Sequence, residues 1–413
     1  SGHILLEGFR HLLQIYIEAG YSKVQAVELI LGKNVFGVDL DIRARQLSQF
    51  ALLLAAMTVD PSFADAHVMP RVLDMEGTLA EGEYPRAEIA TVLAVQDDAV
   101  ITELQTAFAL LTQANNLGSI MKFKISANTR GILTVKVAEL EAHPDDLARK
   151  YLPSFRLILA LTDQYAAIVT NPPYMGSSNM NVELKEYLEE EYPDGKSDLM
   201  TVFMLFAMEH TMPQGRWAMI NLPSWMFLGS FEALRRHLIL NEQIVGLVHN
   251  GRGVFGSDFG SVTFVCSRQQ PFTEGYYRRL FKEHVEVRSV EKIQSLYLDE
   301  SVGKFSAHQE KFIKIPGCPF AYWLSDAVFS AFDNCRTVGM IGQPKQGSTL
   351  GCNEKFVRFW HEVGARRHKW FPCMKGGPFR KWYGNNEYVI NWENDGYEIK
   401  KYAEELYKCS SRT

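Results

Sequence analysis

The feature that most constrains this chain is the alternation of apolar, strand-like runs with helical segments across residues 1–271. Apolar residues at helical spacing predict helices over 4–19, 23–31, 43–57, 97–118, 145–163, 198–211 and 230–242. Runs of β-forming residues predict strands within 34–41, 67–75, 165–170, 216–222, 243–251 and 261–268, the last as a hairpin partner. The pattern favours an α/β fold with a mostly parallel sheet and helices on both faces.

One predicted strand, "YAAIVT", ends in an amide, two prolines and a phenol. Pro172 and Pro173 forbid a further ladder and hold the loop rigid, so the Asn171 amide and the Pro172 carbonyl point in a set direction. Both oxygens accept hydrogen bonds and together suit the two hydrogens of an exocyclic NH₂. Tyr174 is placed to stack on the ring that carries this amine. The four residues therefore predict methyl transfer to a planar amine such as adenine N6.

Composition limits the other classes of function. The net charge of −5 shows no global basic character, so any nucleic-acid binding must come from a local patch. The cysteines form no CxxC pair, which favours reduced thiols in a cytoplasm over secretion or structural zinc. No apolar run reaches the length of a membrane span. The chain begins within a helical pattern and without Met, which is typical of a piece of a longer protein.

The cofactor side of the site has weaker signals. Ser1, Gly2 and His3 open the first predicted helix and resemble the tail of a glycine-rich loop. Asp39 follows the next predicted strand, where an acid accepts from the hydroxyls of a ribose. A surface carboxylate is the alternative interpretation for Asp39, and it is the favoured one for Asp41.

Several motifs together resemble the γ-class N6-adenine DNA methyltransferases, most closely the PglX type of BREX phage-defence systems. These are "SGHILLEGF", "GKNVFGVDLDIRARQLSQFAL", "NNLGSIM", "NPPYMG", "SDLMTVFM", "MINLPSWMFL" and "GRGVFGSDFGSVTF". The front of the cofactor motif, "DPACG", is absent. "NEKFVRFWHEV" and "KWFPCMKGGPFRKWYGNNEYVINWENDG" resemble the family's target-recognition region.

The resemblance implies a class I methyltransferase domain with a Rossmann-like sheet over residues 1–271. It implies an irregular α+β target-recognition region over 272–413, S-adenosylmethionine as cofactor, double-stranded DNA as partner and no metal. By motif, the cofactor would contact Ser1, Gly2, His3, Asp39, Gly118 and Ser119. The flipped adenine would be held by Asn171, Pro172, Pro173 and Tyr174, with Phe255 or Phe259 stacking on its other face, although core packing explains either Phe equally well.

Residues 366–383 contain six Lys or Arg and no acid, with aromatic residues between the charges. This composition is typical of a nucleic-acid patch, and it predicts that Lys369, Lys375, Arg380 and Lys381 contact DNA. A solvated charged face is the alternative interpretation. Residues 346–360 either add polar contacts to DNA or form a core strand with a turn.

Two other functions remain open at this point. A protein-glutamine or RNA methyltransferase shares the NPPY motif but lacks a long tryptophan-rich C-terminal region. A non-catalytic DNA-recognition or partner-docking fragment of a defence complex fits the absent half of the cofactor motif, and the chain alone would then be inactive. The DNA target sequence, an associated nuclease and the oligomeric state leave no readable signal.

Overall fold

The computed structural model describes residues 2–65, 68–75, 84–143, 145–256, 259–269, 274–282, 286–343, 347, 350–364 and 368–410. The chain divides into two compact units, one up to Cys335 and one from Arg336 onward. Within the described residues, no helix has the length and apolar character needed to cross a bilayer.

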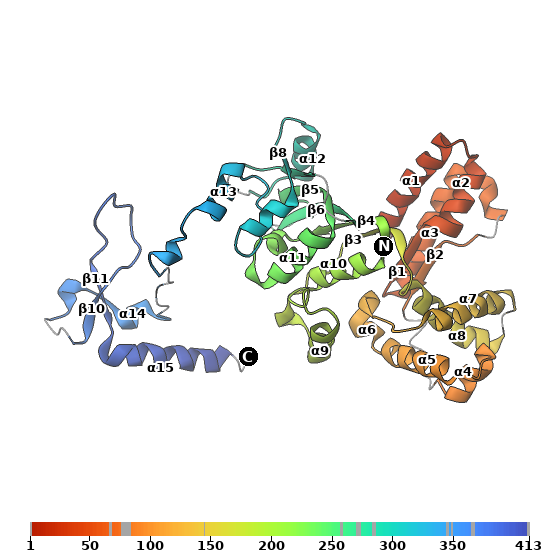
Figure 1. Cartoon of the computed structure of the whole chain (residues 1–413), viewed down its shortest axis with the longest axis horizontal. Helices are drawn as coiled ribbons and strands as arrows, with labels where there is room; N and C mark the ends of the chain where they lie inside the picture. Colours follow the sequence, from red (N-terminus) through yellow and green to blue (C-terminus); the bar gives the residue numbers. More distant parts are fainter. Residues whose placement is uncertain are drawn as a thin grey trace. The chain divides into compact units, whose positions relative to one another are not determined.

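The first unit contains two sheets flanked by helices (Figure 1). Its helices are α1 His3–Glu18, α2 Lys23–Leu29, α3 Ile42–Val59, α4 Arg86–Leu93, α5 Asp98–Leu111, α6 Ala114–Leu117, α7 Ala127–Ala142, α8 Asp146–Ala160, α9 Val182–Glu191, α10 Leu199–His210, α11 Glu232–Asn241, α12 Val290–Leu298 and α13 Asp326–Asn334. Its strands are β1 Phe36–Asp39, β2 Arg71–Asp74, β3 Tyr165–Thr170, β4 Thr211–Asn221, β5 Gln243–Arg252, β6 Gly260–Ser267, β7 Gly275–Arg279 and β8 Lys304–Ala307.

Strand order confirms the α/β class and corrects the description of the sheet as mostly parallel. β1 pairs with β2 in parallel, and the larger sheet has the order β3-β4-β6-β5-β7-β8. β3–β4 and β5–β7 are parallel, whereas β4–β6, β5–β6 and β7–β8 are antiparallel. β6 returns after a short glycine-rich connection, which is too short for the crossover that a parallel neighbour needs. The predicted hairpin therefore exists, and it makes the sheet mixed.

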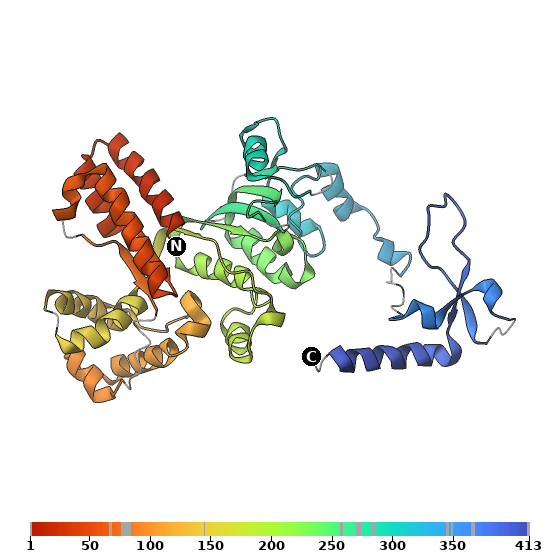
Figure 2. The same ribbon diagram turned by 180° about the vertical axis from the view of Figure 1, so that it is seen from behind.

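Some helices pack on these sheets, and others pack against one another. α1 and α3 pack together, and α3 also packs on β1 and β2. A separate cluster contains α4, α5, α7 and α8, which contact one another (Figure 1, and from behind in Figure 2). α10 packs on β3 and β4 and places buried side chains such as Met200, Met204 and Met208 in the core. The loop after β3 is thus supported by a packed core beneath it.

The segment after residue 272 was predicted to belong to a separate region, but the first compact unit continues to Cys335. β7 and β8 extend the six-stranded sheet. Tyr277, Phe312 and Phe320 are buried in the main core, so the aromatic residues that make this segment look irregular are packing groups. Arg235 lies on α11, and its guanidinium donates to the carbonyl of Gly317 in this later segment. The compact unit therefore ends later than residue 271.

The second unit holds a small antiparallel sheet with the order β10-β11-β9. Its elements are α14 Asn353–Phe356, β9 Val357–Phe359, β10 Trp370–Cys373, β11 Tyr388–Asn391 and α15 Glu393–Ser410, the last with a kink at residues 394–396. Phe356, Ile390 and Ile399 form its core. Residues 346–360 thus contain a short helix and a strand, with Phe356 fully buried.

Glu242 is a buried carboxyl group in the main core, and its side chain accepts a hydrogen bond of 2.8 Å from the indole of Trp217. Burial raises the pKa of Glu242 from 4.5 to about 7. Because the folded protein holds this proton more tightly than the unfolded chain, the free energy of unfolding falls as pH rises from about 4.5 to about 7.

We expect Glu242→Gln to remove this part of the pH dependence, which amounts to roughly 2–3 kcal/mol across the window. Chemical denaturation of both proteins at a series of pH values measures it, and the difference between the two curves cancels the other titrating groups. Parallel curves would show that folding does not raise the pKa of Glu242.

Candidate functional site

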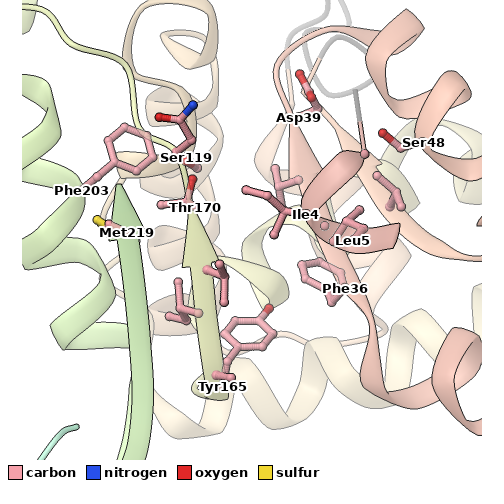
Figure 3. A pocket seen from close by; sticks show the side chains of 18 of the residues that line it. Ile4, Leu5, Phe36, Asp39, Ser48, Ser119, Tyr165, Thr170, Phe203 and Met219 are labelled. Carbon is pink, nitrogen blue, oxygen red and sulfur yellow. The ribbon is translucent and has the colours of Figure 1, made fainter. Parts of the chain in front are cut away.

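A cavity of about 700 Å³ lies between β1 and β3. Side chains from both strands, from the start of α1 and from the segment around Ser119 line it (Figure 3). Asp39 and Asn171 line the end of the cavity where β1 and β3 finish. Ligands of open α/β sheets bind beyond the carboxyl ends of the strands, so this is the expected place for a site.

The amino end of α1 approaches α3 closely at this cavity. Gly2 is the N-cap of α1 and has φ of 76°, a left-handed conformation. A Cβ on Gly2 would lie 2.9 Å from the Ser48 hydroxyl, so only glycine fits here. Gly2 and His3 both line the cavity, and the amino end of a helix favours a carboxylate or other anion. Ser1, the other predicted cofactor contact in this segment, lies outside the described residues.

Asp39 and Ser119 line the cavity as predicted for cofactor contacts. Asp39 ends β1, and its carboxylate accepts a hydrogen bond of 3.2 Å from the Asp41 backbone. Asp41 itself caps α3 and binds the Arg43 guanidinium, as expected for the surface carboxylate that the sequence favoured at this position. Gly118, with φ of 58°, shapes the turn before Ser119 but does not line the cavity.

The loop after β3 presents the Asn171 side chain and buries Pro172 beneath it. The Tyr174 hydroxyl lies 2.9 Å from Asn171 Oδ1 and 2.8 Å from the carbonyl of Ile220, and these two acceptors share its single proton. Burial raises the pKa of Tyr174, so the hydroxyl remains a donor at neutral pH. This contact holds the Asn171 amide at the edge of the cavity, and the amide oxygen keeps a second lone pair for a ligand.

Asp198 fixes the same loop from the far side, a contact that the sequence did not reveal. Its buried carboxylate accepts from the backbone N–H of Met200 at 3.0 Å and also from the Met175 backbone. The backbone of Leu199 donates to the carbonyl of Met175 at 3.0 Å. The start of α10 is therefore hydrogen-bonded to the residue that follows Tyr174.

Two exposed phenylalanines, Phe255 and Phe259, lie near Tyr174 of this loop. The ring of Phe259 lies 6.0 Å from that of Tyr174 at 77°, and Phe255 lies 5.8 Å from Phe259. Phe255 is 46% exposed and lines the cavity, and Phe259 is 38% exposed. Neither ring is fully packed in the core, so both are accessible to a planar ligand. Tyr174 and Phe259 meet edge to face, and a base stacked between them requires one ring to rotate.

In the second unit, the connection between β10 and β11 carries Lys375, Arg380 and Lys381, three of the four residues predicted to bind DNA. Phe379, Trp382 and Tyr383 on this connection are each more than 80% exposed. Lys375 lies over the Tyr388 ring and Lys381 over the Trp382 ring.

Lys369 differs from the other predicted DNA contacts, because it forms an ion pair of 3.1 Å with Glu393 that the sequence did not reveal. Arg366 and Arg367 lie outside the described residues. Among the described residues, no cluster of His, Cys, Asp or Glu is arranged to hold a metal ion.

Residues 33–255 match the Eco57I restriction-modification methylase family, over the segment that contains Asp39, Asn171 and Phe255. The chain belongs to this family. Two curated relatives of this Eco57I-type chain confirm its predicted resemblance to the PglX type. The adenine-specific methyltransferase BrxX of Escherichia coli O9:H4 (strain HS) is 34% identical over 97% of this chain and 36% of its own length. The adenine-specific methyltransferase PglX of Lacticaseibacillus casei (strain Zhang) is 33% identical over 97% of this chain and 35% of its own length.

The Eco57I-type chain thus spans about a third of the length of these relatives. Among solved structures, a nuclease-deletion mutant of the Type ISP enzyme LlaGI with a DNA substrate mimic has a TM-score of 0.40 and 12% identity. It covers 75% of this chain and 26% of its own. A type I methyltransferase subunit from Streptococcus thermophilus has a TM-score of 0.28 and 12% identity, covering 75% and 78%.

Proposed function

We propose that this protein transfers a methyl group from S-adenosylmethionine to N6 of adenine in duplex DNA. The observation that carries the proposal is the Asn171 amide, whose oxygen is oriented by the Tyr174 hydroxyl at the edge of the cavity. The names of both curated relatives, adenine-specific methyltransferases, support the choice of base. The biological role that we propose with this activity is bacterial phage defence or restriction-modification. Because the substrate would be DNA, we place the protein in the cytoplasm.

The cavity suits the cofactor on three grounds. The start of α1 at Gly2 favours the carboxylate of the methionine part. Asp39 accepts from the ribose hydroxyls, and Ser119 lies on the opposite wall. When bound there, S-adenosylmethionine supplies an activated methyl group.

The loop residues prepare the amine that receives the methyl group. Asn171 Oδ1 and the Pro172 carbonyl each accept one hydrogen of the exocyclic NH₂, which favours a tetrahedral nitrogen with its lone pair exposed. With the cofactor bound, Asn171 and the Pro172 carbonyl would hold this lone pair toward the methyl group that the cofactor supplies, and the methylated nitrogen would release one proton to water. No general base is needed, since the transferred methyl group is already activated.

Adenine must leave the DNA duplex to reach this loop. Extrusion costs a few kcal/mol, and stacking on an aromatic ring contributes roughly 1–3 kcal/mol per base. Stacking of the base on Tyr174 and on either Phe255 or Phe259 would therefore be enough to offset the cost of extrusion. The exposed side chains of both phenylalanines are consistent with this role.

The substrate class is tested with the full-length protein and S-adenosylmethionine labelled in its methyl group. Equal masses of duplex DNA, RNA and cell protein are offered separately. We expect label in DNA only. Label confined to RNA or protein would replace this proposal with the corresponding methyltransferase, and absence of label from all three despite cofactor binding would support a non-catalytic recognition role.

The basic connection between β10 and β11 is proposed as a phosphate-binding surface. We expect Lys375, Arg380 and Lys381 changed together to Ala to weaken DNA binding and to flatten its salt dependence. Each lost phosphate contact reduces the slope of log K against log salt by about 0.9. Fluorescence anisotropy of labelled duplex DNA at several salt concentrations measures the slope.

The control for this triple variant changes Lys355, Lys400 and Lys401 to Ala. These exposed lysines lie on the same unit, and their substitution removes the same positive charge as the first variant. An equal loss of slope in both variants would mean that net charge alone matters. An unchanged slope in the first variant would assign this stretch a structural role.

A further inference from the structure

Four strands of the larger sheet finish at the same edge as the candidate site. β3 and β4 are parallel, and β4 and β5 are both antiparallel to β6, so β3, β4 and β5 run in one direction. β7 is parallel to β5 and therefore runs in this direction too. Arg279 is the last residue of β7, and Asn171 directly follows β3. Both residues thus lie at the carboxyl edge of one sheet.

The side chain of Arg279 is held by three aromatic rings. Its guanidinium carbon lies 5.3 Å from the centre of the Trp323 ring and 5.8 Å from the centres of the Phe281 and Phe305 rings. The backbone N–H of Arg279 donates to the carbonyl of Gly303 at 2.8 Å, which fixes the strand beneath it. Arg279 and the three rings are all partly exposed. A guanidinium that stacks on rings keeps its planar N–H groups directed outward at its edge.

Arg279 differs from the arginine next to it in how its donors are used. The guanidinium of Arg278 donates to the carbonyls of Leu296 and Asp299 near the end of α12, so it joins two elements of the fold. Among the described residues, no carboxylate pairs with the guanidinium of Arg279 and no group accepts a hydrogen bond from it. Its five N–H donors therefore remain available to a ligand.

The charge around Arg279 is positive. Residues 275–282, GYYRRLFK, contain three basic residues and no acid, and Lys282 is exposed. His249 lies beside Arg279 on the neighbouring strand. Burial, and then the charge of Arg279, lower the pKa of His249 to about 4, so its imidazole is neutral at pH 7. A ligand that uses these donors and balances their charge is an anion, and a phosphate suits the planar guanidinium.

The position of Arg279 relates it to DNA that is bound at Asn171. The strand order β3-β4-β6-β5-β7 places four strand spacings, about 19 Å, between β3 and β7. Base pairs in duplex DNA rise about 3.4 Å each, so this separation corresponds to about five or six base pairs. A duplex that presents adenine to Asn171 and follows the edge of the sheet carries a phosphate close to Arg279.

We propose that Arg279, assisted by Lys282, binds one backbone phosphate of the DNA, about five or six base pairs from the methylated adenine. The contact holds the duplex along the carboxyl edge of the sheet and carries no sequence information of its own. The inference rests on the proposed function, because it takes duplex DNA as the substrate. It adds a phosphate contact in the first unit to those proposed for the connection between β10 and β11.

The test uses the full-length protein and duplexes that contain the site it methylates, in which one phosphate at a time is replaced by an uncharged methylphosphonate. Fluorescence anisotropy measures binding. We expect replacement about five or six base pairs from the adenine to weaken binding by wild-type protein about tenfold, the loss of one charge-assisted hydrogen bond. Arg279→Gln should cause a similar loss on unmodified DNA. The two changes together should weaken binding no further, because each removes the same contact.

Arg216→Gln is the matched control, since Arg216 is an exposed arginine at the opposite end of the same sheet. It removes the same charge and should respond to every methylphosphonate as the wild type does. Circular dichroism reports whether each variant is folded. If Arg279→Gln is unfolded, Lys282→Gln takes its place in the same comparison, because Lys282 is exposed and serves the same phosphate.

Three results would overturn the inference. If the loss from Arg279→Gln adds to the loss from every methylphosphonate, Arg279 contacts none of these phosphates, and the proposed function still stands. If Arg216→Gln weakens binding as much as Arg279→Gln does, only the net charge of the unit matters. If the full-length protein neither binds nor methylates duplex DNA, the inference and the proposed function both fail.

Discussion

Asn171→Ala should lower methyl transfer by the full-length protein at least about 100-fold, the effect expected when a preorganised hydrogen-bonding group is removed from a reacting centre. The dissociation constant for S-adenosylmethionine should change by less than about threefold, because the proposal assigns the amide oxygen to the substrate amine and not to the cofactor. Single-turnover methylation and isothermal titration calorimetry measure the two quantities.

Asn179→Ala is the matched control, since Asn179 is an exposed amide on the same loop but does not line the cavity. It should retain both activities. If Asn171→Ala abolished cofactor binding while the protein stayed folded, the amide would belong to the cofactor site. If it retained methyl transfer, the assigned role of Asn171 would be wrong.

Asp39→Ala should weaken S-adenosylmethionine binding by about 10- to 150-fold, which corresponds to the roughly 1.5–3 kcal/mol of a hydrogen bond to a charged group. The loss should appear in KM for the cofactor, with kcat largely restored at saturating cofactor. Asp39 is remote from the substrate amine in the proposed arrangement, so DNA affinity should not change.

Asp41→Ala separates this effect from a general loss of stability. Asp41 caps α3, and loss of a cap costs about 1 kcal/mol in the free energy of unfolding. Asp41→Ala should therefore lower the unfolding midpoint but keep cofactor affinity. Equal loss of affinity in the two variants would mean that the loop conformation, and not the Asp39 carboxylate, binds the cofactor.

The strand that precedes Asn171 was predictable because local signals agree there. β-branched residues specify β3, and two prolines end it. Helix α7 was not predicted, since its threonines and valines have weak helical preference and its burial comes from the surrounding helices. Helix α9 was missed for a similar reason: its polar sequence buries only Leu184 and Leu188.

In the candidate site too, features set by local sequence were predictable, and contacts between distant segments were not. Asp39 ends β1 and Asn171 follows β3, so strand patterns alone placed both residues at the carboxyl ends of strands. The contacts of Tyr174 with Ile220, of Asp198 with the Met175 backbone and of Lys369 with Glu393 join distant segments. Such pairs depend on how elements pack, which a single sequence does not encode locally. The burial of aromatic residues after 272 likewise depends on β7 joining the larger sheet, which the sequence does not encode locally.

The central claim, that Asn171 presents the N6 amine of adenine for methylation, is tested most directly by identifying the product nucleoside. The full-length protein is incubated with duplex DNA and S-adenosylmethionine carrying a deuterated methyl group, and the DNA is digested to nucleosides for mass spectrometry. We predict that the label appears as N6-methyladenine and disappears with Asn171→Ala. Label on the exocyclic amine of cytosine, or N6-methyladenine that persists in Asn171→Ala, would contradict the account.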